Sequence, residues 1–328
     1  MRIVVKLGVL VWAGLIPGLL AHAQFLPEPL ALVASPTSPS PGEAFVVEVS
    51  APAMDKNASY FSWAVDRKSR SDLSGLGKSS ISLVAGELGS DTRIDVGVLR
   101  AGGGIAGTAT LTIRTADLTL YWYAETYTPR WYKGRALAVQ NSVVNVVAIP
   151  NIIIRGRAAR PENLIYRWSL DDEDNVLVGA GKDIFRIRTS DLPKSSHYIK
   201  VAVEDVNKIV RKEGIVNIVP VLPRTIIYSS SPLGGIESRH APMFLATGKR
   251  GILDWVAESF FFPVSSRKNL SYRWTVGGGA VGGTPENPYF LTIDTGAKPA
   301  TLLPITISVN DKDDLIPSAY KLLTLLLQ

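Results

Sequence analysis

The chain has 328 residues, of which 46% are hydrophobic, with 35 Lys and Arg, 29 Asp and Glu, and no cysteine. A net charge of +6 over this length is too weak for a polyanion-binding surface, so we expect no nucleic-acid partner. The lack of cysteine excludes disulfides, thiol catalysis, iron–sulfur clusters and cysteine zinc sites. Folding must therefore depend on burial of apolar side chains.

The first 23 residues have the pattern of an export signal. Arg2 and Lys6 are basic, Leu7–Leu20 is an apolar core, and Ala21-His22-Ala23 fits a small-x-small cleavage site. The alternative is an uncleaved membrane anchor, although the apolar run is short for a bilayer span of about 20 residues. We expect a mature chain that begins at Gln24 and is secreted or associated with the cell envelope. Membrane contact would come only through this segment if it stayed uncleaved.

A short pattern, aromatic-x-Trp-x-aliphatic, occurs three times, in Phe61–Val65, Tyr166–Leu170 and Tyr272–Val276. The tryptophans lie 105 and 106 residues apart, which is about the length of one β-sandwich domain. In each copy, apolar residues follow 31, 33 and 35 positions after the tryptophan, with polar or small residues between them. This period of two is typical of a strand with one buried face.

The repeat predicts an all-β chain of three tandem sandwich domains after a signal peptide. We place the signal peptide at 1–23 and the domains at 24–115, 116–221 and 222–328. The links between the domains are short and contain little glycine, which favours a stiff rod.

Trp63, Trp168 and Trp274 have apolar residues two positions away on each side. Residues at this spacing share one face of a strand, so we expect all three tryptophans in the cores between the sheets.

The strands that follow in the second and third copies end alike, as Tyr198–Asp205 and Ile305–Asp311. With the preceding tryptophan strand, this pattern resembles polycystic-kidney-disease-type (PKD-like) and related bacterial immunoglobulin-like domains, in which such an Asp precedes a turn. The first copy has Arg100 at this position and departs from the pattern. The resemblance covers nearly the whole mature chain. It implies tandem immunoglobulin-like sandwiches that serve in extracellular spacing, adhesion or assembly rather than catalysis.

One motif imitates a phosphate-binding loop. Gly75–Ser79 reads Gly-Leu-Gly-Lys-Ser, but Asp72 stands where the motif needs its first glycine. The second copy repeats the pattern as Gly179–Lys182 at nearly the same distance from its tryptophan. We interpret both as glycine turns before a strand.

Asp171, Asp172 and Asp174 form an acidic run and are weak candidates for a calcium site, because calcium prefers clustered oxygen ligands. The equivalent segments of the other copies are basic in Asp66–Arg70 and glycine-rich in Gly277–Gly279. This variation indicates a solvated hairpin end, and we expect no metal and no cofactor.

An aromatic segment opens the second copy, with six aromatic residues between Tyr121 and Tyr132. Such rings suit sugar or peptide surfaces, or they could pack against a neighbouring domain. We choose Tyr127, Trp131 and Tyr132 as the candidate contact surface, because turn-forming residues and charges surround the Trp131-Tyr132 pair. For Tyr121 and Tyr123 we favour a structural clasp.

No catalytic arrangement stands out, since the two mature-chain histidines, His197 and His240, have no matching partners in the sequence. We therefore expect no enzyme. The leading hypothesis is an exported, non-catalytic rod of immunoglobulin-like domains that acts in cell-surface adhesion, envelope assembly or protein–protein interaction. The alternative is a string of carbohydrate-binding modules that uses the aromatic segment of domain 2. In either case we expect the partner to be a protein or a glycan at the cell surface.

Overall fold

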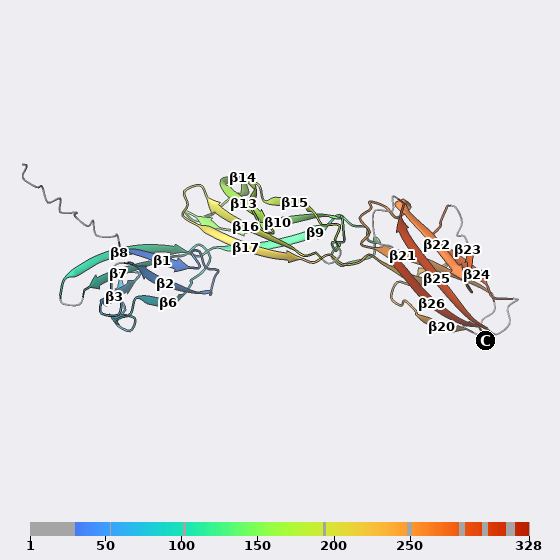
Figure 1. Cartoon of the computed structure of the whole chain (residues 1–328), viewed down its shortest axis with the longest axis horizontal. Helices are drawn as coiled ribbons and strands as arrows, with labels where there is room; N and C mark the ends of the chain where they lie inside the picture. Colours follow the sequence, from blue (N-terminus) through green and yellow to red (C-terminus); the bar gives the residue numbers. More distant parts are fainter. Residues whose placement is uncertain are drawn as a thin grey trace, which may run out of the picture.

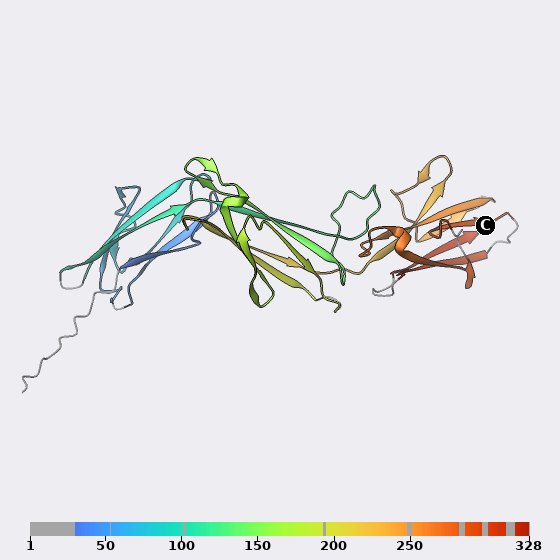
Figure 2. The same cartoon turned by 90° about the horizontal axis from the view of Figure 1, so that it is seen from above.

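A computed structural model of the chain describes residues 30–52, 54–100, 103–192, 195–247, 251–281, 286–296, 301–312 and 319–327. The predicted signal peptide lies outside the described residues. Figures 1 and 2 show three pairs of sheets that follow one another along the long axis of the molecule. We call these pairs the N-terminal, middle and C-terminal sandwiches. Within the described residues, no helix has the length and apolar character needed to cross a membrane.

The N-terminal sandwich packs sheet β1-β2-β6 against sheet β4-β3-β7-β8, with β5 paired to β3. Its strands are β1 (Ala31–Ser35), β2 (Ala44–Ser50), β3 (Tyr60–Val65), β4 (Lys68–Ser69), β5 (Gly75–Leu76), β6 (Ser80–Val84), β7 (Asp91–Leu99) and β8 (Ile105–Arg114).

The middle sandwich packs sheet β15-β10-β9 against sheet β14-β13-β16-β17, with a small hairpin β11-β12 beside them. Its elements are β9 (Asp117–Ala124), β10 (Val143–Asn151), β11 (Ile153–Ile154), β12 (Arg157–Ala158), the 3-10 turn η1 (Pro161–Asn163), β13 (Leu164–Leu170), β14 (Glu173–Ala180), β15 (Ile184–Arg188), β16 (His197–Asp205) and β17 (Arg211–Ile218).

The C-terminal sandwich packs sheet β19-β18-β21-β24 against sheet β20-β26-β25-β22-β23, in which β20 runs parallel to β26. Its elements are β18 (Arg224–Ser231), β19 (Gly235–Ile236), β20 (Phe244–Thr247), β21 (Ile252–Phe260), the 3-10 turn η2 (Arg267–Asn269), β22 (Leu270–Val276), β23 (Gly279–Val281), β24 (Phe290–Asp294), β25 (Thr301–Asp311) and β26 (Ala319–Leu327).

The sheets pair because alternate residues of their strands are apolar. In β2, Phe45, Val47 and Val49 are at most 1% exposed, while the residues between them face solvent. Side chains on one face of a pleated strand point the same way, so each sheet offers one apolar face to its partner. Each sandwich accordingly encloses its own hydrophobic core, built from both of its sheets.

Each core contains one of the three repeated tryptophans. Trp63, Trp168 and Trp274 are all 0% exposed. Each indole N–H donates a hydrogen bond to a backbone carbonyl: that of Lys78 at 2.9 Å, of Lys182 at 2.7 Å and of Pro288 at 3.1 Å. The polar edge of each ring is thus satisfied inside an apolar core, which avoids the cost of a buried unpaired donor.

The glycine turns predicted from the sequence are confirmed, and they hold two of these carbonyls. Gly77 and Gly181 have φ angles of +73° and +67°, a left-handed conformation that glycine adopts without a steric cost. Each turn places the carbonyl of the following lysine against the tryptophan indole. The motif that resembles a phosphate-binding loop therefore supplies a hydrogen-bond acceptor to the tryptophan of the hydrophobic core.

The joint between the N-terminal and middle sandwiches is closed by polar contacts. Lys212 of β17 donates from Nζ to the Ser38 carbonyl at 2.9 Å and to Ser40 Oγ at 2.8 Å, and lies 3.4 Å from the Glu43 carboxylate. Hydrogen bonding from the Ser40 backbone N–H, followed by the Lys212 charge, lowers the pKa of Glu43. At Gly89, a Cβ atom would lie 2.5 Å from Ile153 Cβ of the middle sandwich, so the close approach there requires glycine.

We expect Trp168→Ala to lower the free energy of unfolding of the middle sandwich by about 3–5 kcal/mol, because it opens a cavity and removes the ring stacked on Phe185 at 5.4 Å. Urea unfolding followed by circular dichroism measures the loss. Tyr123→Ala is the control, since Tyr123 is 40% exposed and its removal should change the stability by no more than about 0.5 kcal/mol. Equal unfolding midpoints for the two variants would contradict the central role of the tryptophan.

Candidate functional site

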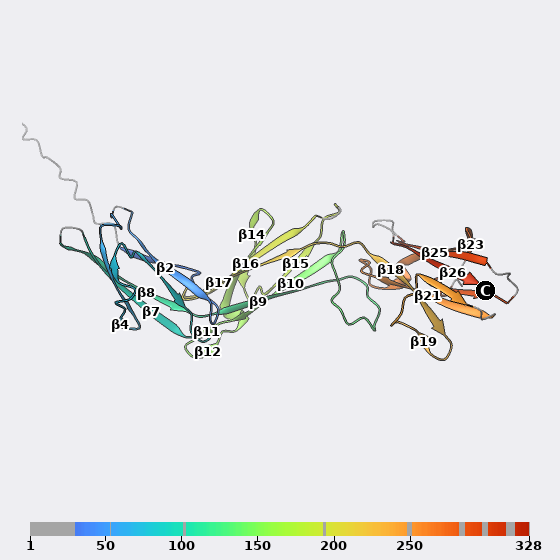
Figure 3. The same cartoon turned by 90° about the horizontal axis from the view of Figure 1, so that it is seen from below.

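The segment between β9 and β10, residues 125–142, leaves the middle sandwich and reaches the C-terminal one, as Figures 2 and 3 show. We call it the clasp loop. Tyr127 forms an isolated antiparallel bridge with Phe262: its N–H donates to the Phe262 carbonyl, and its carbonyl accepts from Phe261 N–H, both at 2.7 Å. Further along, the Ala138 carbonyl accepts a 2.8 Å hydrogen bond from Val221 N–H in the linker. Backbone hydrogen bonds therefore fix the loop on both sides of its tip.

The tip is a turn for a local reason. Pro129 fixes its own φ angle, and the Pro129 carbonyl accepts a 2.9 Å hydrogen bond from Tyr132 N–H. This closed turn places Trp131 and Tyr132 side by side in a loop, as the sequence predicts, rather than within a strand.

The rings of this pair pack against the outer face of sheet β19-β18-β21-β24. Trp131 makes edge contacts with Tyr228 at 5.6 Å and Phe260 at 5.8 Å between ring centroids. Tyr132 makes similar contacts with Phe260 at 5.6 Å and Phe261 at 5.8 Å. Tyr228, Phe260 and Phe261 belong to a fourth apolar cluster, which also contains Val139 of the clasp loop and against which Tyr132 packs. The clasp loop thus joins the two sandwiches through aromatic burial.

The sequence expectation that Tyr121 and Tyr123 form the clasp is wrong. They are 49% and 40% exposed on the outer face of β9, with their rings 6.4 Å apart. Trp122 between them points into the core, so the period of two along the strand directs both neighbours outward. Trp131, by contrast, packs against Tyr228 and Phe260 and is still 37% exposed. A binding role for Tyr127, Trp131 and Tyr132 stays a prediction.

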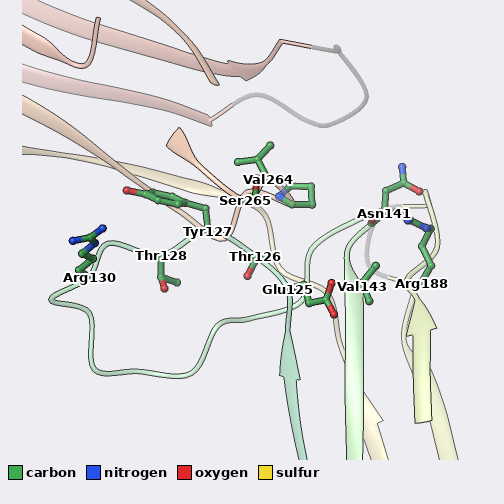
Figure 4. A pocket seen from close by; sticks show the side chains of 11 residues that line it. Glu125, Thr126, Tyr127, Thr128, Arg130, Asn141, Val143, Arg188, Val264 and Ser265 are labelled. Atoms are coloured by element: carbon green, nitrogen blue, oxygen red, sulfur yellow. Dashed lines mark hydrogen bonds between the residues drawn. The ribbon is translucent and has the colours of Figure 1, made fainter. Parts of the chain in front are cut away.

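Two cavities lie in the cleft between the middle and C-terminal sandwiches, and Tyr127 lines both. The first has a volume of about 590 Å³, and Figure 4 shows it between the clasp loop, the ends of the middle strands and the Val264–Ser265 segment. The second has a volume of about 500 Å³, and its lining includes Arg130, Trp131, Glu258 and Arg267.

Glu258 is the unusual group of the second cavity. It is 2% exposed, its Oε1 accepts a 3.2 Å hydrogen bond from Arg267 Nη1, and its Oε2 accepts none from the described residues. Burial raises the pKa of the Glu258 carboxyl, and the nearby Arg267 charge only partly opposes this. Burial also raises the pKa of Tyr127, and the negative charge of Glu258 adds to that effect. Arg267 is held in place by the Tyr289 ring, whose centroid lies 3.7 Å from its guanidinium carbon.

The sequence reasoning missed Glu258, although a signal exists. It is a lone acid inside the largely apolar run from Trp255 to Phe262. In the sheet it lies opposite Ile226, on the same outer face as Phe260, and the clasp loop covers that face. A charged residue in an apolar strand indicates either a polar partner or a functional site.

The acidic run of the middle sandwich has a structural use. Asp171 closes the turn after β13: its Oδ1 accepts from Tyr198 N–H at 2.8 Å and its Oδ2 lies 3.1 Å from His197 Nδ1. His197 Nε2 accepts from Ser190 N–H, which leaves the ring proton on Nδ1 to donate to Asp171. Asp172 and Asp174 are exposed. Within the described ranges, no three His, Asp or Glu side chains come together as a metal site.

No protein-family model matches the chain, and no curated protein matches its sequence. Among solved structures, the three N-terminal domains of the bacteriophage RB49 Highly Immunogenic Outer Capsid protein align with 11% identity over 91% of this chain and 98% of that one, with a TM-score of 0.25. The central fibronectin-III array of RIM-binding protein aligns with 12% identity over 88% and 93%, with a TM-score of 0.31.

A Bacteroides ovatus SGBP-B, solved in complex with a mixed-linkage heptasaccharide, aligns with 7% identity over 89% of this chain and 64% of that one, with a TM-score of 0.22. The strand order and the separate cores of the described residues make this chain a tandem array of immunoglobulin-like β-sandwiches.

We expect Tyr132→Ala to loosen the joint between the middle and C-terminal sandwiches, because it removes two ring contacts from the shared apolar cluster. The loss should be about 1–2 kcal/mol, or several degrees in the melting temperature of the transition that includes the joint. Small-angle scattering should show a broader distribution of particle lengths than for the parent chain. Unchanged melting and scattering would show that the clasp loop does not hold the joint.

The raised pKa of Glu258 predicts a dependence of stability on pH. A carboxyl whose pKa is higher in the folded than in the unfolded state loses stability as pH rises from the unfolded value, about 4.3, through the folded value. Glu258→Gln cannot ionise and keeps an acceptor for Arg267, so its melting temperature should exceed that of the parent chain more at pH 8 than at pH 4. Calorimetry at the two pH values measures the difference, and the same difference at both would contradict the assignment.

Proposed function

We propose that the protein is an exported, non-catalytic rod of immunoglobulin-like domains that works at the cell surface through contacts in the cleft beside the clasp loop. Its role would be adhesion, envelope assembly or protein–protein interaction outside the cytoplasm. The domain boundaries at residues 115 and 221 and the signal peptide of residues 1–23 belong to this proposal.

The observation that supports the proposal is that specific non-covalent contacts hold the sandwiches together at both joints of the rod. Lys212 and its partners hold the first joint, and the Tyr127–Phe262 bridge and the aromatic cluster hold the second. Bonds of this kind restrict bending, so a surface on the C-terminal half stands at a defined distance from the N-terminal end. A spacer that presents a binding surface needs such a property, whereas a flexible string of domains would lack it.

The cleft also supports the second candidate function, that of a carbohydrate-binding protein. It supports one binding site and not the string of modules that the sequence suggested. Tyr132 packs into the joint, and only part of the Trp131 side chain is exposed. In this second function the chain would have one sugar-binding site, at the joint between the middle and C-terminal sandwiches, and not a string of binding modules.

We expect the chain in its producing cells to be recovered outside the cytoplasm with Gln24 at its N-terminus. Mass spectrometry of cell fractions measures this. The control carries Arg2→Glu and Lys6→Glu, which reverse the charge of the signal's basic region and should leave the chain in the cytoplasm. Recovery of the parent chain in the cytoplasm with residues 1–23 attached would refute export.

A further inference from the structure

We propose that the cavity between Trp131 and Glu258 binds one pyranose ring of a cell-surface glycan. This inference rests on the proposed function, because it assigns a ligand class to the contact surface of the rod. The cavity volume of about 500 Å³ lies within the range of small-molecule sites, roughly 300–1,000 Å³.

Trp131 supplies a flat and rigid platform. Trp131 lines the cavity and is 37% exposed, and two edge contacts of its ring with Tyr228 and Phe260 fix its orientation. A ring already held in place loses little conformational entropy when a ligand stacks on it. The C–H face of a pyranose fits such an aromatic surface, while its hydroxyl groups point outward from the ring edge.

Glu258 supplies a buried acceptor. Its Oε2 has no hydrogen-bond partner among the described residues, and an unpaired acceptor in a buried site is costly. This oxygen is closed to solvent, so a small shift of the Glu258 side chain must bring it to the cavity wall before a ligand hydroxyl can donate to it and remove the cost. Because burial strengthens each polar contact, one such bond discriminates strongly between ligands that have the hydroxyl and those that lack it.

Arginine donors lie next to this acceptor. A guanidinium has five N–H donors, and Arg267 gives one of them to Glu258 Oε1. Arg130 is exposed and also lines the cavity. Neighbouring hydroxyls of a sugar both donate and accept, which matches an acceptor beside donors. Two arginines against one carboxylate disfavour a cationic ligand, so a lysine side chain or a free amino sugar fits poorly.

The site depends on both sandwiches, because Trp131 and Arg130 come from the clasp loop and Glu258 and Arg267 from the C-terminal sandwich. Sugar binding would therefore also stabilise the joint, since a ligand that contacts both sides favours the closed arrangement.

The test uses fluorescently labelled chain beginning at Gln24 and cells of the producing organism. Cells are left untreated, treated with periodate, which cleaves the vicinal diols of sugars, or treated with protease. We expect binding to untreated and protease-treated cells and loss of binding after periodate. Protease-sensitive, periodate-resistant binding would overturn the sugar site while leaving the proposed function intact. Absence of binding to untreated cells would count against both.

Variants locate the site on the molecule. We expect Trp131→Ala and Glu258→Gln each to weaken binding to untreated cells by at least tenfold. Glu258→Gln is expected to be the more stable protein at neutral pH, so its loss of binding cannot come from unfolding. Tyr123→Ala is the matched control, an exposed aromatic on β9 outside the cavity, and should bind within twofold of the parent chain. Loss of binding in Tyr123→Ala, or full binding by Glu258→Gln, would overturn the assignment.

Discussion

The structure depends on burying one tryptophan between two sheets without a disulfide to assist. With no cysteine in the chain, apolar packing alone holds each pair of sheets together. The repeated indole fills the space between the sheets of each sandwich, and its N–H has a hydrogen-bond partner there. In two of the sandwiches a glycine turn delivers a lysine carbonyl to that N–H, and in the third the Pro288 carbonyl does so. Core packing and turn geometry are thus linked in each sandwich.

The two joints use different chemistry for the same purpose. At the first, Lys212 holds the turn-rich segment around Ser38 and Ser40 through polar contacts. At the second, the clasp loop adds a backbone bridge and an aromatic cluster. In both cases the connection between the first two strands of one sandwich reaches the next sandwich along the chain. The rod is therefore stiffened by its own loops, with no added domain or covalent link.

The second joint contains a buried ionisable residue, which apolar packing alone does not require. Glu258 lies on the face that the clasp loop covers, and burial raises the pKa of its carboxyl. A leucine at this position would give a drier and more stable joint, because buried ion pairs often contribute less than apolar side chains of similar size. This cleft differs from the first joint because it keeps a charged side chain that lowers stability. That side chain lies beside a partly exposed tryptophan and two arginines.

The all-β class, the threefold repeat and the burial of Trp63, Trp168 and Trp274 could be predicted from the sequence, because strand patterns and spacings are local properties of the chain. The sequence also located the loop that carries Trp131 and Tyr132, since Pro129 and the flanking charges mark a turn. Which aromatic residues form the clasp, and which residues they contact, could not be predicted and is seen in the folded chain. Trp131 and Glu258 lie 127 residues apart in the sequence and share a cavity because one sandwich is docked on another. No local pattern encodes such a contact, because it depends on how two separately folded units pack.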